Sequence, residues 1–222
     1  GFVAERLGEK YDVYVLDVRG RGLSSSGPEL AYDAETCAQD VNAFAAALSL
    51  ASYALLGHSM GARFALRAAV LQPAGVRRLV LVDPPVSGPG RRAYPGQWPW
   101  YADSIRQSLP GMSAEQMRAF CPTWSEEQRR LRAEWLHTCY EPAIQRAYDD
   151  FHQVDSHRDY PLLTMPTLLM AAGKGGVIQP EDRAEIRALQ PEIAIVEVEN
   201  AGHMIPWDDF DGFFRALGDF LD

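Results

Sequence analysis

The segment that most restricts the fold is YALLGHSMGARFALRAAVLQP, which covers residues 53–73. Its first part is short and apolar, as in a strand that is buried on both faces of a sheet. Its second part has the composition of a helix and stops at Pro73. The chain turns from one to the other at GHSMG, residues 57–61. A strand followed at once by a helix is the repeating unit of a parallel sheet.

The same alternation of strand and helix recurs along the chain. Besides the strand at 53–59, strands are predicted at 11–18, 76–85, 166–173 and 193–200, and helices at 33–50, 60–73, 180–189 and 207–221. This pattern predicts a parallel sheet with helices on both faces. Ligands bind such sheets beyond the carboxyl ends of the strands, so residues directly after the strands are the first candidates for a site.

Residues 86–160 interrupt this rhythm and are predicted to form an inserted helical lid, with residues 1–85 and 161–222 as the core. Prolines and aromatic residues come first, and polar helices are predicted at 113–120, 125–138 and 141–152. The aromatic side chains either line a pocket or form the core of the lid itself. They are Trp98, Trp100, Tyr101 and Trp124.

Composition excludes several classes of partner. The net charge is −9 and no basic stripe occurs, so a nucleic acid is not expected as a partner, and an anionic ligand would need local arginines. No apolar run is long enough for a membrane span, which takes about 18 residues. The three cysteines form no CxxC pair, which argues against a metal site or a disulfide framework and is typical of a cytoplasmic protein.

The turn 57–61 fits the pattern G-x-S-x-G and makes Ser59 the candidate nucleophile. Glycines on both sides are expected because larger side chains would clash at a sharp, strained turn. Met60 then begins a helix, where its amide could stabilise an oxyanion. The alternative is a glycine-rich turn with a serine that has no function.

Ser59 needs a general base, and His203 is the candidate because it follows the last predicted strand in NAGHMIPWDD, residues 200–209. His58 flanks Ser59, and its side chain is expected to point away. The remaining histidines lie in or beside the predicted lid: His137, His152 and His157. The alternative for His203 is a loop residue that only caps the final helix.

The acid that should orient the histidine is absent from the loop where it is expected. The segment AAGKGGVIQPED, residues 171–182, has no carboxylate before Glu181 and Asp182, which are predicted to begin a helix. One strand earlier, LVLVDPP ends in Asp83, and the prolines after it stiffen the loop. We therefore predict that Asp83 is the acid, since a triad is defined by geometry rather than by chain order.

Two alternatives to this assignment remain open. Asp83 could simply cap the Pro-Pro turn. Asp208 or Asp209 could serve as the acid instead, although both are expected at the start of the last helix.

With these residues identified, the chain resembles the α/β-hydrolase superfamily along nearly its whole length. The segments DVRGRGLSS (17–25), GHSMG and NAGHMIPWDD carry the resemblance. More narrowly, GHSMGARFALRAA followed by LVLVDPPVSGPGRRAYP resembles the N-formylmaleamate deformylases of aerobic nicotinate degradation, whose relatives include 2-(acetamidomethylene)succinate hydrolase. In that group the acid follows the sixth strand, which corresponds to Asp83.

The resemblance implies a serine hydrolase that needs no metal or organic cofactor. Ser59 would attack the formyl carbonyl of N-formylmaleamate, and a formyl-enzyme would then release formate. The small anionic substrate needs a cation, and Arg91 and Arg92 in GPGRR (88–92) are the candidates. Alternatively, both arginines are solvated.

Other functions remain open for the same scaffold. They are cleavage of another small amide, an ester, a lactone or a C–C bond, cofactor-free haloperoxidase-like activity, or a non-catalytic binding role.

The superfamily normally has three further strands and an HG-type oxyanion loop before the point where this chain begins. Residues 1–10 are expected to be the tail of the helix that precedes the first predicted strand. The chain is therefore expected to be a fragment that lacks the second oxyanion donor, whose loss costs on the order of 10²–10³ in rate.

Overall fold

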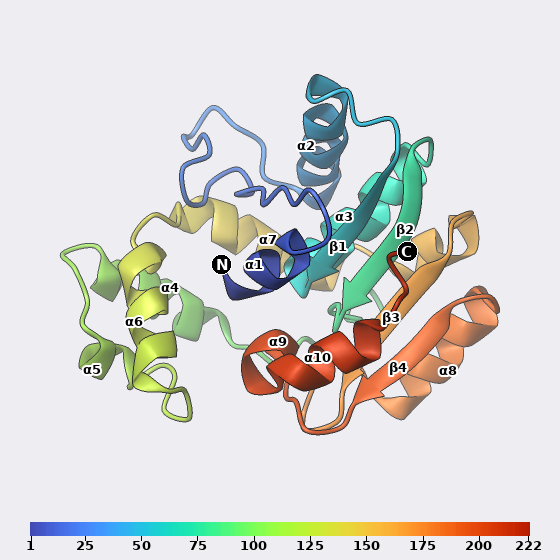
Figure 1. The fold of residues 1–222 in the computed structure, drawn as a ribbon. Helices are drawn as coiled ribbons and strands as arrows, with labels where there is room; N and C mark the ends of the chain where they lie inside the picture. Colours follow the sequence, from blue (N-terminus) through green and yellow to red (C-terminus); the bar gives the residue numbers. More distant parts are fainter. The chain divides into compact units, whose positions relative to one another are not determined.

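The computed structural model describes residues 1–222 and divides into two compact units. Unit 1 consists of Gly1–Leu16, Ala34–Tyr94 and Phe151–Asp222, and unit 2 consists of Asp17–Asp33 and Pro95–Asp150. Figure 1 traces the chain through both. The functional division into a core and a lid stays a prediction.

The centre of unit 1 is a sheet of four parallel strands in the order β1-β2-β3-β4. The strands are β1 (Tyr53–His58), β2 (Val76–Val82), β3 (Thr167–Ala172) and β4 (Ala194–Val198). All four were predicted within a few residues of these bounds. Because they run parallel, their carboxyl ends meet at one edge of the sheet, where the candidate residues lie.

Helices cover both faces of this sheet, as the continuous burial of β3 and of the second half of β2 requires. Val80, Val82 and Met170 share one apolar cluster with Phe213 of α10 (Phe210–Leu217), and α1 (Phe2–Gly8) packs against the same cluster. The helix α3 (Met60–Leu71) packs on β1 and β2, and it also contacts α2 (Ala34–Ala47) and the 3-10 helix η1 (His157–Leu162). Figure 1 shows α10 and α3 on opposite sides of the strands.

The C-terminal helices differ slightly from the prediction of one helix over 207–221. Two helices occupy this region, α9 (Ile205–Asp208) and α10, whereas α8 (Pro180–Leu189) agrees with its predicted range. The break falls at Asp209, whose side chain accepts a hydrogen bond from the backbone N–H of Gly212 at 2.8 Å and so caps α10. The spacing of apolar residues alone does not show where a helix is capped.

The prediction of a strand over residues 11–18 is wrong. This segment pairs with no strand, and the side chains of Val13, Tyr14 and Val15 are exposed. A strand is defined by hydrogen bonds to a neighbour, whereas alternating apolar residues indicate only a tendency to be buried.

Unit 2 is mainly helical and contains α4 (Trp98–Ser108), α5 (Ala114–Met117), α6 (Glu126–Leu136) and most of α7 (Glu141–Gln153), which continues into unit 1 from Phe151. Ser113 and Ser125 begin α5 and α6 with reciprocal capping boxes. The sequence analysis did not predict α4, because prolines and aromatic residues crowd this part of the chain. Pro99 instead occupies the first turn of the helix, where proline is well tolerated.

Two of the aromatic residues of unit 2 belong to its own core. Trp100 and Trp124 pack against a buried cluster that includes Met117 and Leu136. The guanidinium of Arg132 lies 4.9 Å from the ring centre of Trp100 and 5.8 Å from that of Trp124. For these two residues the structure favours the core alternative over a pocket wall.

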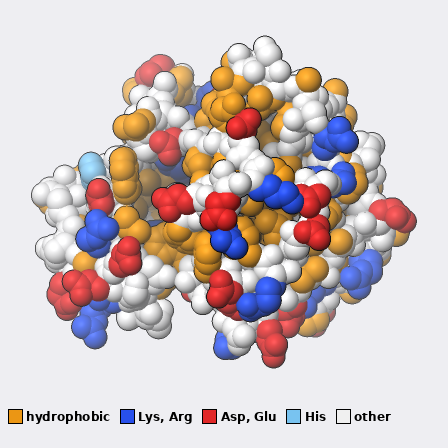
Figure 2. All heavy atoms as spheres, in the orientation of Figure 1, with side chains coloured by type: hydrophobic (Ala, Val, Ile, Leu, Met, Phe, Trp, Pro, Cys, Tyr) orange, Lys and Arg blue, Asp and Glu red, His pale blue; other side chains and the backbone are white.

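The surface view in Figure 2 shows basic and acidic side chains mixed over the face that is drawn, without a single basic patch. None of the helices combines the length and apolar character that crossing a membrane would require.

Candidate active site

Ser59, His203 and Asp83 form one continuous chain of hydrogen bonds beyond the ends of β1, β4 and β2. His203 Nδ1 lies 2.7 Å from Asp83 Oδ2, and His203 Nε2 lies 2.9 Å from Ser59 Oγ. Because a carboxylate only accepts, Nδ1–H must donate to Asp83. Nε2 of the neutral ring is then the acceptor for the Ser59 hydroxyl, which is the arrangement that general-base activation of a serine requires.

Ser59 sits at a strained turn between β1 and α3. Its φ is 53°, in the left-handed region of backbone conformations. A residue other than glycine adopts this conformation only at a cost in free energy. A Cβ at Gly57 would lie 2.3 Å from the backbone oxygen of Gly61, so only glycine fits there. The expected clash at Gly61 is wrong, because a Cβ added there meets nothing within 4 Å. Met60 is the first residue of α3.

Asp83 is completely buried at the end of β2, and its φ of 42° is also left-handed. Its N–H still donates to the carbonyl of Met170 at 2.8 Å, so the backbone is fixed to β3. The carboxylate accepts from the N–H of Val177 at 3.0 Å and, at a longer 3.5 Å, from that of Ala172. These partners replace the water that a buried carboxylate has lost.

The loop between β3 and α8 makes room for the Asp83 carboxylate. A Cβ at Gly176 would lie 2.8 Å from both carboxylate oxygens of Asp83 and 2.6 Å from Ala172 Cβ. The loop that lacks an acid therefore supplies a backbone amide at Val177 and a space at Gly176. Sequence reasoning missed this role, although the glycines in AAGKGG were the available signal.

His58 supports the backbone of His203. Its Nε2 lies 2.7 Å from the His203 carbonyl oxygen, and the two rings are 5.0 Å apart. Burial, with a smaller effect from the neighbouring His203, lowers the pKa of His58 to about 4. His58 is therefore neutral at pH 7, and its Nε2–H donates to the carbonyl. This contact was not predicted, because sequence reasoning only considered whether His58 could act on Ser59.

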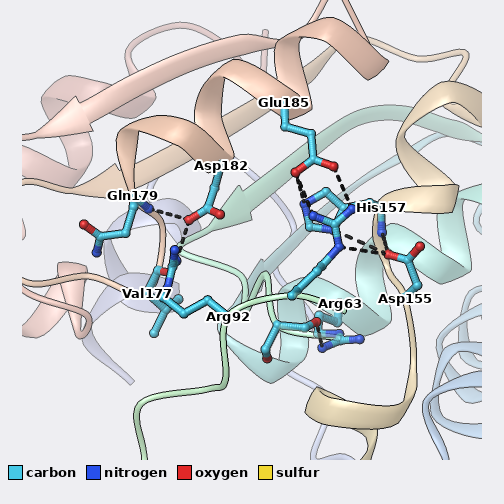
Figure 3. Close-up of polar contacts among 10 residues, drawn as sticks. Arg63, Arg92, Asp155, His157, Val177, Gln179, Asp182 and Glu185 are labelled. Atoms are coloured by element: carbon cyan, nitrogen blue, oxygen red, sulfur yellow. Dashed lines mark hydrogen bonds and ion pairs between the residues drawn. The ribbon is translucent and has the colours of Figure 1, made fainter. Parts of the chain in front are cut away.

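Arg91 and Arg92, the predicted carboxylate binders, both pair with acidic residues of α8. Figure 3 shows the pair of Arg92 with Asp182. Arg91 donates from both terminal nitrogens to Glu185, at 2.7 Å each, and these bonds lower the pKa of Glu185. Arg92 Nη2 donates to Asp182 at 2.6 Å and to the carbonyl of Val177 at 3.1 Å. Neither arginine is simply solvated, and their role in substrate binding stays a prediction.

The other candidate acids have different partners in the structure. Asp182 accepts from the N–H of Gln179 at 2.7 Å and so caps α8, as predicted for an acidic residue at a helix start. Asp209 caps α10. Asp208 has its pKa raised by burial, against the opposing effect of hydrogen bonds from the backbone of Gly202 and Met204.

His157 is a buried residue outside the hydrogen-bonded triad. Neither of its ring nitrogens has a hydrogen-bond partner, and they lie 3.6 Å from Asp155 and 3.9 Å from Glu185 (Figure 3). Burial and the nearby Arg91 lower its pKa. No group of three or more His, Cys, Asp or Glu residues is arranged to hold a metal ion.

Comparison with known proteins agrees with this geometry. The alpha/beta hydrolase fold family matches residues 2–210. An N-formylmaleamate deformylase from Pseudomonas putida KT2440 is 70% identical over 222 residues, which are 100% of this chain and 83% of that protein.

Solved structures give the same result. The crystal structure of the N-formylmaleamic acid deformylase from Pseudomonas putida S16 aligns with a TM-score of 0.93 and 53% identity, over 98% of this chain and 85% of that one. A structure of E-2-(acetamidomethylene)succinate hydrolase, at 22% identity and a TM-score of 0.79, covers 99% of this chain and 85% of that one and shows the shared fold.

Proposed function

Because the chain belongs to the alpha/beta hydrolase fold family, we propose that it is a serine hydrolase that cleaves N-formylmaleamate to maleamate and formate. The observation that carries this proposal is the hydrogen-bonded chain from Ser59 through His203 to Asp83. The substrate comes from the similarity to the deformylase of Pseudomonas putida, with 70% identity over the whole chain.

In the first half of the reaction, Ser59 Oγ attacks the formyl carbon while His203 Nε2 takes the hydroxyl proton. Asp83 holds the imidazole in the required tautomer and stabilises the imidazolium that forms. The tetrahedral oxyanion would lie near the N-terminus of α3, where the Met60 amide is the proposed donor. The C–N bond then breaks, and the departing nitrogen takes the proton from His203 to give maleamate.

In the second half of the reaction, a water molecule hydrolyses the formyl-enzyme. His203 takes a proton from a water molecule, whose oxygen attacks the formyl-enzyme carbon. The C–O bond to Ser59 breaks, His203 returns the proton to Ser59 Oγ, and formic acid leaves and loses its proton to water as formate. Every proton transfer in this scheme uses residues of this chain, so the scheme itself requires no metal or organic cofactor.

The substrate carries a carboxylate, and Arg91 and Arg92 are the two candidates for its cationic partner. To bind the substrate directly, each would have to give up a carboxylate that it already contacts, Glu185 or Asp182. A substrate role for either arginine therefore predicts a change in KM when the arginine is removed, with little change in kcat.

The direct test is formate release from N-formylmaleamate, with Ser59→Ala as the control. Formate that depends on Ser59 would support the reaction, the substrate and the nucleophile together. A folded protein that reacts with a fluorophosphonate probe at Ser59 but releases no formate would keep the serine hydrolase and discard this substrate.

A further inference from the structure

The carboxylate of Asp83 depends on a loop that lies outside the sheet. Ala172 belongs to β3, so its amide is held by the strand. Val177 lies between β3 and α8, and its N–H makes the shorter of the two amide contacts, at 3.0 Å to the same Oδ2 that accepts from His203. The position of that N–H therefore depends on what fixes the loop.

The two ends of this loop are fixed by ordinary secondary structure. At the start, Gly173 N–H donates to Val198 and Lys174 N–H donates to Ala201, at 3.0 and 2.8 Å. At the far end, Asp182 accepts from Gln179 N–H and begins α8. Between these ends, Gly176 and Val177 belong to neither a strand nor a helix.

Arg92 bridges this middle part to the start of α8. The same nitrogen, Nη2, donates to the carbonyl of Val177 at 3.1 Å and to Asp182 at 2.6 Å, as Figure 3 shows. The backbone of Val177 is thus held at two points, because its carbonyl oxygen accepts from Arg92 and its N–H donates to Asp83. Arg91, in contrast, pairs with Glu185 and Asp155 and has no such contact with Val177.

The exposure of the Arg92–Asp182 ion pair indicates whether it serves stability or function. The side chain of Arg92 is 48% exposed, and exposed ion pairs contribute little to the stability of a fold. A contact of this kind can still matter for function, because a displacement of about 1 Å at a catalytic group can cost 10²-fold in rate.

We propose that Arg92 is a positioning residue that fixes the loop 176–179, so that the Val177 N–H holds the Asp83 carboxylate against His203. This inference rests on the proposed function, since it gives Arg92 a role in activating Ser59 rather than in binding the substrate carboxylate. It predicts that loss of Arg92 affects every reaction of Ser59, including reactions with molecules that carry no carboxylate.

The test combines two measurements on Arg92→Ala and Arg92→Lys. The first is the second-order rate of labelling of Ser59 by an uncharged alkyl fluorophosphonate, which needs an activated serine but no carboxylate-binding site. The second is kcat and KM for formate release from N-formylmaleamate. For Arg92→Ala we expect labelling and kcat to fall together by about 10-fold to 100-fold with KM nearly unchanged. Arg92→Lys, which keeps one donor group, should lose less.

Arg183→Ala is the matched control. Arg183 lies on α8, the helix that carries the Arg92 partner Asp182, and it pairs with Glu197. Its loss therefore removes an ion pair of the same helix but no side-chain contact to the loop. We expect labelling and kcat within about twofold of the parent, since surface changes away from a site have small effects. Circular dichroism and thermal unfolding of all variants show whether they fold.

Unchanged labelling together with a raised KM in Arg92→Ala would overturn the inference and assign Arg92 to the substrate. Equal losses in Arg92→Ala and Arg183→Ala would also overturn it, because the effect would then come from α8 in general. Failure of the proposed function looks different: the parent protein would label at Ser59 but release no formate, and the labelling comparison would still test Arg92.

Discussion

The ends of β2 and β3 are neighbours in the sheet, yet they contribute opposite things to the site. The end of β2 supplies a buried carboxylate at Asp83, held at a left-handed φ before two prolines. The end of β3 supplies no carboxylate, but an N–H at Val177 and a space at Gly176 that this carboxylate fills. A catalytic acid and the groups that hold it can therefore lie at the end of either of two adjacent strands, because the ends of both strands reach the same point near His203.

The largest effect is expected at the acid itself. Asp83→Asn should lower kcat by about 10⁴, because an amide can donate to Nδ1 and so favours the wrong histidine tautomer. The fold should persist, since Asn has the same shape as Asp and, with its amide nitrogen toward His203, its oxygen still faces the Ala172 N–H. Formate release measures the change, and thermal unfolding checks the fold. Activity close to that of the parent would break the assignment of the acid to β2.

The next largest effect is expected on the supporting side, at Gly176. Gly176→Ala places a Cβ 2.8 Å from both Asp83 oxygens, so either the loop or the carboxylate must move. We expect kcat to fall by about 10-fold to 100-fold and the free energy of unfolding to fall by about 1–3 kcal/mol. Kinetics and urea unfolding measure both. A variant with the activity and stability of the parent would contradict the close fit between this loop and Asp83.

The end of β1 also contributes to the site. His58 forms a hydrogen bond to the backbone carbonyl of His203, whereas Asp83 forms one to its ring. The pKa of His58 is lowered from 6.5 to about 4, so between these values the unfolded chain binds a proton that the folded one does not. Stability should therefore fall as the pH falls through this window.

Between pH 7 and pH 5 we expect His58 to account for a loss of about 2 kcal/mol in the free energy of unfolding. Urea unfolding of the parent and of His58→Asn at the two pH values isolates this contribution, because the variant cannot titrate at this position. The same pH dependence in both proteins would rule out His58 as its source.

The smallest effect is expected at the tip of the β3–α8 loop. The side chain of Lys174 donates a hydrogen bond to the exposed Asn200, at 3.2 Å, and none to Asp83. Lys174→Ala should leave kcat within about twofold and the free energy of unfolding within about 0.5 kcal/mol. A tenfold loss of formate release would instead mean that the tip of the loop, and not only its base, serves the reaction.

The parts of the site that sequence reasoning could predict are those set by local structure. A strand that turns into a helix at GHSMG positions Ser59, and a loop directly after the last strand positions His203. Asp83 follows the same logic, because parallel strands end at one edge of the sheet. The fold class comes from the alternation of strands and helices.

The parts that were missed depend on contacts between residues far apart in the sequence. Arg92 meets Val177 and Asp182 across 85 and 90 positions, and His58 meets His203 across 145. No local pattern reports such pairs. The wrongly predicted strand at 11–18 has the same origin, since apolar alternation carries no information about which strand, if any, lies beside it.

The measurement that tests the central claim most directly is proton NMR of the histidine Nδ1–H that donates to Asp83. A proton in such a charge-assisted hydrogen bond, shielded from water, should give a resonance far downfield in the parent protein. The account predicts that Asp83→Asn abolishes this signal and that Asp182→Asn retains it. Loss of the signal in Asp182→Asn with retention in Asp83→Asn would place the acid on the β3 side and contradict the account.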